Sequence, residues 1–126
     1  MNMKRFFRWE KASRDTIDFK KIYVDIAGDI LAGLLLSQII YWHLPDEYGD
    51  SKLRVKKEGK MWLAKGRDDW HQEVRLSPKQ FDRASDILAK KGIIEKKRFK
   101  FNGSPTIHIH LNEEVFLELW KALLGE

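Results

Sequence analysis

The side chains best suited to chemistry in this sequence are the basic and amide groups of a predicted helix over residues 78–91. Its apolar residues recur at helical spacing and share one face, so its polar residues face outward. Those outward residues are Lys79, Gln80, Arg83 and Lys90. Lysine and arginine can bond to guanine, and glutamine to adenine, on the major-groove edge of DNA. Asp82 and Asp86 would repel phosphates, so the first half of the helix is the expected contact zone.

A second group of cations follows on a predicted strand over residues 93–101, IIEKKRFKF. Because side chains alternate along a strand, Lys96, Arg98 and Lys100 share one face, where they can follow a phosphate backbone. Asn102-Gly103 predicts a tight hairpin tip, since both residues tolerate positive φ. Lysines on an edge strand also prevent pairing between sheets, so the stripe is compatible with either role.

Other chemistries find little support in the residue types present. The sequence has no cysteine, which excludes disulfides, thiolate metal sites and cysteine nucleophiles. His108 and His110 have a spacing that can chelate a metal, but without a third ligand nearby they are expected on a solvated strand face. His43 and His71 have no recognisable catalytic partners, and no phosphate-binding glycine loop or nucleophile elbow occurs. We therefore expect no enzymatic activity, no cofactor and no bound metal.

The outward-facing helix belongs to a run of elements with clear boundaries. A short helix over 67–74 precedes it, Ser77 and Pro78 predict its start, and Gly92 predicts its end. The basic strand, the hairpin tip and an alternating strand over 106–111 follow. Helix, turn, helix and two-stranded ribbon predict a winged helix-turn-helix, an α+β fold that is mostly helical with a small antiparallel sheet and a two-stranded wing. This architecture places its second helix in the major groove and its ribbon against the backbone.

The rest of the chain is predicted to flank this unit. The expected elements are a flexible arm or weak helix over 1–16, a short edge strand over 19–24, one long helix over 25–43, a polar loop over 45–60 that can hold a short strand at 53–55, and a strand over 61–65. Pro45 ends the long helix because the residue before proline avoids the helical region. Trp62 and Trp70 are expected to pack behind the outward-facing helix.

A closing amphipathic helix is predicted over 112–124, with Asn112 as its cap. Its apolar face is wider than one small domain needs to bury. The residues of that face are Val115, Phe116, Leu119, Trp120 and Leu123. We expect this helix to serve association with a second copy or a partner, although packing over its own sheet is an open alternative. The expected organisation is a basic arm over 1–18, a winged domain over 19–111 and an acidic helix over 112–126.

Length and charge set bounds on the class of protein. The 126 residues suffice for one domain, and the formal net charge is +5. Residues 74–111 contain nine basic and three acidic side chains, a net charge of +6, whereas residues 112–126 have a net charge of −3. Such clustering is typical of nucleic-acid binding, although most charge runs form a solvated face.

No segment has the features of a membrane span or of a secretory signal. The most apolar stretch, over 30–44, is shorter than the roughly 20 residues needed to cross a bilayer. The basic N-terminus lacks the apolar core of a signal peptide. We expect a cytoplasmic location without contact to a membrane.

Three stretches of the sequence resemble a known family in their order and spacing. They are LLLSQIIYWHLPD at 34–46, MWLAKGRDDWHQEVRLSPKQFDRASDILAKKGIIEKK at 61–97 and PTIHIHLN at 105–112. Over about residues 20–112 the chain resembles the winged-helix domain of phage and mobile-element replication proteins. That family includes replisome organisers and the N-terminal domain of DnaD-like primosome proteins. The resemblance implies binding to origin or single-strand-junction DNA and recruitment of helicase-loading machinery.

The resemblance also implies roles for individual residues. Ser77, Lys79, Gln80 and Arg83 match the start of the family's recognition helix, and residues 96–100 match its wing. Relatives usually continue into a second domain, whereas one acidic helix follows the wing here, so DNA binding is the part expected to carry over. The candidate DNA-contacting residues are Arg67, Ser77, Lys79, Gln80, Arg83, Lys96, Arg98, Lys100 and Asn102.

The sequence as a whole predicts a non-enzymatic protein that binds double-stranded DNA in the replication of a phage, plasmid or integrated element. Replication proteins, and a second copy bound through residues 112–124, are the other expected partners. Two alternatives stay open. One is a dimeric transcriptional regulator, which needs a two-fold operator. The other is a winged-helix module for protein interaction that does not bind DNA.

Overall fold

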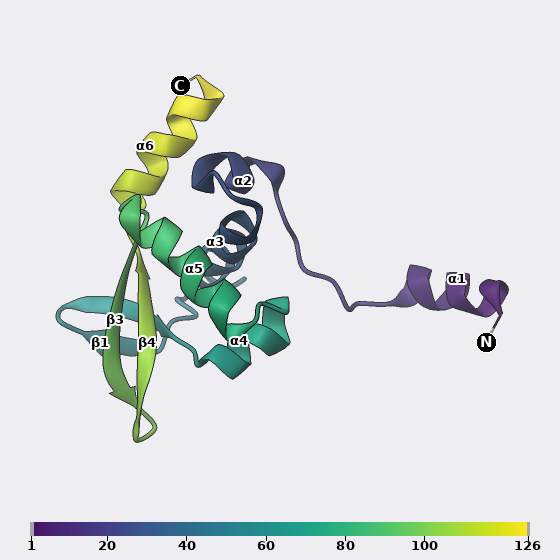
Figure 1. Cartoon of the computed structure of the whole chain (residues 1–126), viewed down its shortest axis with the longest axis horizontal. Helices are drawn as coiled ribbons and strands as arrows, with labels where there is room; N and C mark the ends of the chain where they lie inside the picture. Colours follow the sequence, from purple (N-terminus) through teal and green to yellow (C-terminus); the bar gives the residue numbers. More distant parts are fainter. Residues whose placement is uncertain (1, 126) are drawn as a thin grey trace.

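The computed structural model describes residues 2–125 and has an α+β architecture. Within these residues, helices and strands follow one another in the order α1 (Met3–Ala12), α2 (Lys21–Ala27), α3 (Ile30–His43), β1 (Val55–Lys57), β2 (Lys60–Ala64), α4 (Arg67–Val74), α5 (Pro78–Lys90), β3 (Ile94–Phe101), β4 (Ser104–Leu111) and α6 (Glu113–Leu124). Met1 and Glu126, the outermost residues of the predicted arm and of the predicted acidic helix, lie outside the described residues. Figure 1 shows α1 at the end of an extended segment and α6 projecting from another side of the body.

The strands form one antiparallel sheet in the order β1-β2-β4-β3. β3 and β4 pair along their whole length, from Ile94 opposite Leu111 to Phe101 opposite Ser104. β2 joins β4 only near Ile109. The tip of the β3–β4 hairpin therefore extends beyond the rest of the sheet, as Figure 1 shows.

The core lies between the helices and one face of the sheet. Trp70 of α4 stacks on Phe81 of α5 with ring centroids 5.6 Å apart, and both side chains are buried. α3 packs against α5, and Ile109 of β4 belongs to the same buried cluster. The helical spacing of Phe81, Ala84 and Leu88 predicted this inward face, and all three residues are buried.

The N-terminal half differs from the sequence prediction in two places. Residues 19–24, predicted as an edge strand, run into helix α2 instead. The single helix predicted over 25–43 is broken into α2 and α3, which are bent by 113°. Gly28 ends α2 in the left-handed conformation, and the Asp29 carboxylate caps α3 by accepting a hydrogen bond from the Ala32 amide at 3.0 Å. A glycine followed by a capping residue is a common stop and start of two helices, so this break was readable from the sequence.

The other predicted elements are confirmed, with boundaries shifted by a few residues at most. The short strand expected at 53–55 is β1 at 55–57, and the strand expected at 61–65 is β2. The predicted arm contains α1, in which no residue is buried. Gly92 follows α5 with φ 76, as its predicted role at the helix end requires.

A largely buried polar network joins α3, α4 and Lys65, the residue that follows β2. The Glu73 carboxylate accepts hydrogen bonds from Gln38 Nε2 at 2.9 Å and from Trp42 Nε1 at 3.0 Å, and it forms an ion pair with Lys65. Lys65 Nζ also lies over the Trp42 ring, 4.3 Å from its centroid. Gln38 and Trp42 both belong to the SQIIYW segment that carries part of the family resemblance, so here that segment serves the fold.

The N-terminal arm is fastened to the domain through α3. The Ser37 hydroxyl donates a hydrogen bond to the Asp18 carbonyl at 2.9 Å. Residues 13–20 belong to no helix or strand, and residues 14–20 are exposed. α1 consequently stands apart from the body, as Figure 1 shows.

Candidate nucleic-acid interface

α4 and α5 meet at a tight turn, as the sequence predicted. Arg75 adopts the left-handed conformation with φ 62, and its guanidinium donates to the carbonyls of His71 and Gln72 at the end of α4. Leu76 is buried, and Ser77 is the N-cap of α5. The turn therefore ends one helix, enters the core and begins the next.

Two candidate contact residues, Ser77 and Gln80, form the cap of α5. Ser77 Oγ accepts a hydrogen bond from the Gln80 amide at 3.2 Å, and Gln80 Oε1 accepts one from the Ser77 amide at 2.9 Å. This reciprocal pair satisfies backbone donors that the first turn of a helix leaves free. A bidentate contact between glutamine and adenine needs both the oxygen and the amino group of the side chain. The capping bond already uses one acceptor site of Gln80 Oε1, so a contact with adenine would compete with the cap for the orientation of this side chain.

Two of the three candidate arginines, Arg67 and Arg83, are held by carboxylates. Arg83 donates to both oxygens of Asp29, the α3 cap, at 2.8 and 3.2 Å. These bonds lower the pKa of the Asp29 carboxyl from its ordinary value. Arg67 forms an ion pair with Asp82 at 2.9 Å. The Arg83 side chain is 60% exposed, so a phosphate could compete with its carboxylate partner.

The cation stripe of β3 divides between the body and the wing tip. Lys96, which the sequence placed in solvent, instead contacts α5, where Nζ donates to Ser85 Oγ at 2.8 Å and to Asp86 at 2.7 Å. Its side chain is only 20% exposed, because the stripe lies on the sheet face that carries the core. The bond from Lys96 lowers the pKa of the Asp86 carboxyl. Arg98 and Lys100 continue the same face beyond the core and are exposed, as predicted.

Three of the candidate cations are exposed, at the start of α5 and on the outer half of the β3–β4 hairpin. Within residues 2–125, Lys79, Arg98 and Lys100 form no ion pair. The hairpin tip is the predicted tight turn, since Asn102 and Gly103 have φ of 51 and 83 and are both exposed. These positions together can follow a phosphate backbone.

A cleft of about 360 Å³ lies between the start of α4, α5 and the wing. Lys65, Arg67 and Arg98 line it, together with the carboxylates of Asp68 and Asp69. The mixture of charges makes the cleft a poor site for a free anion. It does place Arg98 beside the helix pair, so α5 and the wing can approach one duplex together.

The opposite face of the sheet carries a separate aromatic cluster. Trp62 is fully buried there, with its ring centroid 5.4 Å from that of Phe99 and 5.6 Å from that of His110. Its Nε1 donates to the Lys57 carbonyl at 2.9 Å, which holds the β1–β2 hairpin against the sheet. The prediction that Trp62 packs behind α5 is therefore wrong.

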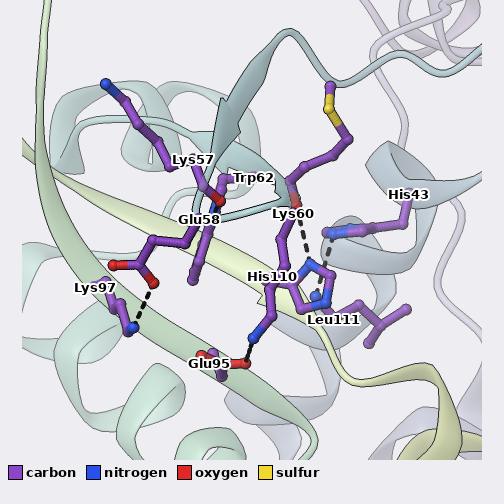
Figure 2. Close-up of polar contacts among 10 residues, drawn as sticks. His43, Lys57, Glu58, Lys60, Trp62, Glu95, Lys97, His110 and Leu111 are labelled. Atoms are coloured by element: carbon purple, nitrogen blue, oxygen red, sulfur yellow. Dashed lines mark hydrogen bonds and ion pairs between the residues drawn. The ribbon is translucent and has the colours of Figure 1, made fainter.

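Ion pairs border this cluster and bind the β1–β2 hairpin to β3. Lys60 pairs with Glu95, and Lys97 pairs with Glu58 at 2.7 Å. Figure 2 shows both pairs on either side of Trp62. Lys97, the one cation of β3 on this face, is thus used within the fold.

The prediction that His108 and His110 lie on a solvated strand face is wrong. His108 is fully buried, and its ring meets the edges of Phe99 and Phe101 with centroids 5.1 and 6.1 Å apart. His110 Nδ1 lies 3.0 Å from the Met61 carbonyl. Within the part of the chain that the structure describes, no group of three histidine, aspartate or glutamate side chains is arranged to hold a metal ion.

The partly buried side chain of His43 is expected to make the stability of the fold depend on pH. His43 Nδ1 donates to the Ile39 carbonyl at 2.8 Å, and its Nε2 accepts from the Leu111 amide at 3.2 Å, as Figure 2 shows in part. Only a neutral imidazole can do both. Burial is the main cause that lowers the His43 pKa from 6.5, and the neighbouring His110 lowers it further.

Between the lowered folded pKa of His43 and its unfolded value of 6.5, the unfolded chain binds a proton that the folded chain does not. The contribution of His43 to the free energy of unfolding is therefore expected to be complete above pH 6.5. It should decrease as the pH falls from 6.5 through the folded pKa. Its slope would be at most about 1.4 kcal/mol per pH unit. Urea unfolding at a series of pH values measures it. His43→Gln should be less stable at neutral pH, with a flatter profile over this window; an unchanged profile would contradict the assignment.

The sequence did not predict the ion pairs that the candidate cations form. Asp29 and Arg83 lie 54 positions apart, and their contact depends on the break between α2 and α3. The pairing of Lys96 with Asp86 depends on β3 crossing α5 with its cation face inward. The sequence did contain a signal for the second pair. Lys96, Arg98 and Lys100 are separated from the buried Ile94 by even numbers of residues, so they lie on the same face of the strand as Ile94.

Comparison with known proteins found no relative of this chain. None of the protein-family models matches the chain, and the comparisons with curated proteins and with solved structures also found no match. Over residues 2–125, no helix by itself has the length and apolar character to cross a membrane; the bent pair α2 and α3 meets these criteria only when taken together.

Proposed function

We propose that this protein binds duplex DNA without enzymatic activity, and that it acts in the cytoplasm in the replication of a phage, plasmid or integrated element. The order α3, β1–β2, α4, α5 and β3–β4 is compatible with a winged helix-turn-helix. In that fold the second helix of the pair enters the major groove and the hairpin lies on the backbone. α5 and the β3–β4 hairpin would take these two roles here.

The observation that carries the proposal is the set of exposed, unpaired cations on α5 and the wing. Lys79 lies in the first turn of α5, and Arg98 lines the cleft between the helix pair and the wing. Lys100 lies closer to the hairpin tip. Cations spread over a helix start and a protruding hairpin suit contact with successive phosphates, which fix the position of a protein on DNA.

The bonded state of the other candidates supports binding with little sequence preference. Gln80 and Arg83 have the chemistry to read bases, yet one caps its helix and the other holds Asp29. A base contact by either side chain would compete with its internal bonds for orientation. Phosphate contacts are therefore expected to dominate the affinity.

The same pairings favour one alternative, a protein-interaction module that does not bind DNA. Arg67, Arg83 and Lys96 all have carboxylate partners, so much of the positive charge near α5 is neutralised within the fold. A dimeric regulator would instead show preference for one two-fold DNA site. A binding titration separates the three functions.

Titration of the intact chain against random-sequence duplex is expected to show binding that weakens with salt. Three phosphate contacts at about −0.9 each give a log–log slope of about −2.7. Joint Arg98→Ala and Lys100→Ala replacement should reduce the slope to about −0.9 and weaken binding to all sequences alike. Both side chains are exposed, so the fold should be retained.

The matched control is joint Lys60→Ala and Lys97→Ala replacement, which also removes two cations. Both are used in ion pairs on the opposite face of the sheet, so the salt slope should not change. No binding of the intact chain at low salt would exclude the DNA proposal and favour the interaction module. An equal loss in both variants would show that only total charge matters.

A further inference from the structure

The N-terminal helix α1 has two faces that its own domain does not use. Its apolar residues, at spacings of three and four, lie largely exposed on one side, and its basic residues lie on the other. The apolar residues are Met3, Phe6, Phe7 and Trp9, and the basic residues are Lys4, Arg5, Arg8 and Lys11. Phe6 and Trp9 contact each other with ring centroids 6.0 Å apart. No α1 residue is buried, so the helix lacks the tertiary packing that stabilises short helices.

The C-terminal helix α6 has the opposite charge and a similar excess of apolar surface. Of the five residues predicted to serve association, Val115, Phe116, Leu119 and Trp120 instead pack against the core of their own chain, and Phe116 meets Tyr23 of α2 with centroids 6.2 Å apart. Leu123, the fifth, is about half exposed, as are Leu117 and Leu124, and no α6 residue is fully buried. The charged residues of α6 are Glu113, Glu114, Glu118 and Lys121.

We propose that α1 of one chain docks on α6 of a second copy, and that the exchange is reciprocal. α1 has four basic residues and one acidic residue, whereas α6 has three acidic residues and one basic residue. The two helices thus complement each other in charge, and each leaves apolar side chains exposed on one face, which on α6 are Leu117 and Leu124 at a spacing of seven. This proposal goes beyond DNA binding and is independent of it.

The details of α1 favour a protein surface over a lipid surface. Glu10 follows Phe6 and Phe7 at spacings of four and three, so it lies within the apolar side of the helix. Insertion into a bilayer would bury this carboxylate without a partner, at considerable cost. On α6 it finds a cation, Lys121, close to the exposed leucines.

A second copy, not the same chain, is the occupant that fits the observed arrangement. The arm extends away from its own body, and Figure 1 shows α1 and α6 on different sides of the molecule. Ser37 fastens the segment at Asp18 and leaves residues 13–17 to lead α1 outward. A reciprocal exchange uses the same surfaces twice, as two-fold dimers do.

Sedimentation velocity of the full chain from low to high micromolar concentration tests the exchange. Two charge-reversed chains are compared with it, Lys4→Glu with Arg8→Glu on α1, and Glu114→Lys with Glu118→Lys on α6. Each pair is spaced i, i+4 and exposed. The intact chain should dimerise, and each reversed chain alone should dissociate roughly tenfold more readily or beyond, since two repulsive pairs arise at each contact.

Mixing the two reversed chains gives the sharpest readout. In their heterodimer, acidic α1 meets basic α6 and basic α1 meets acidic α6, so the mixture should regain association that neither chain shows alone. Reversal of Lys56 and Lys57 on β1 serves as control and should leave dimerisation unchanged. A monomeric intact chain at high micromolar concentration would overturn the proposal. So would reversed chains that stay folded by circular dichroism but never combine, as pairing within one chain predicts.

Discussion

Replacing Glu73 with alanine is expected to lower the free energy of unfolding by about 3–5 kcal/mol, because it removes one partner of a buried ion pair. Lys65 would keep its charge in a site where its side chain is 17% exposed. Gln38 and Trp42 would lose the acceptor that satisfies their N–H groups. Since small domains are stable by only about 5–15 kcal/mol, urea unfolding followed by circular dichroism should show a large shift.

Two further variants separate charge from hydrogen bonding at this site. Glu73→Gln keeps one oxygen as acceptor, so it should be less destabilising than alanine. Adding Lys65→Met to Glu73→Gln removes the unpaired charge and should recover part of the loss. If the free energy of unfolding of Glu73→Ala lies within about 1 kcal/mol of that of the intact chain, the network contributes no more than an ordinary surface ion pair.

The second large effect is expected for Gly33→Ala, at the crossing of α2 and α3. A Cβ at Gly33 would lie 2.7 Å from Val24 Cα and 2.8 Å from Val24 N, both backbone atoms. Alanine favours a helix by about 1 kcal/mol over glycine, but overpacking costs roughly 1–3 kcal/mol and more where backbone must move. We expect Gly33→Ala to lower the free energy of unfolding measured with denaturant, because α2 and α3 must move apart to accommodate the added Cβ.

Gly66→Ser is the matched control for Gly33→Ala, because an added Cβ meets nothing closer than Asp69 Oδ2 at 3.6 Å. Serine is also a good N-cap for α4, so stability should be retained. Combining Gly33→Ala with Val24→Ala should not restore stability, since the closest atoms belong to the backbone. Full rescue by that second substitution would place the conflict in the Val24 side chain instead.

Local signals predicted the part of the chain from α4 onward better than its N-terminal half. The Ser77 cap, the Pro78 start and the Asn102 hairpin tip each act through their own backbone neighbours, and the structure confirms them. Residues 19–24 have a strand-like composition, yet they lead into α2, which packs on α3 at Gly33. Tertiary packing overrides a weak local preference in that segment.

Partners of individual side chains were beyond reach of the sequence. Periodicity identified the polar face of α5 and the cation stripe of β3, but the neutralisation of these cations depends on contacts between separate elements. His108 shows the same limit, because alternation places it on the outer sheet face but cannot reveal that aromatic rings and the β1–β2 hairpin cover that face. Periodicity predicts which way a side chain points, and only the fold decides what it meets.

The attachment of the arm through Ser37 and Asp18 has a consequence for how two copies would share DNA. Copies joined by α1 and α6 would be connected through the extended segment 13–17, without a broad interface that fixes their α5 helices in one frame. Their DNA surfaces could then engage duplex sites at variable spacing, unlike dimers whose geometry sets the distance between half-sites. The gain would be avidity: once one copy is bound, the linker sets the effective concentration of the other.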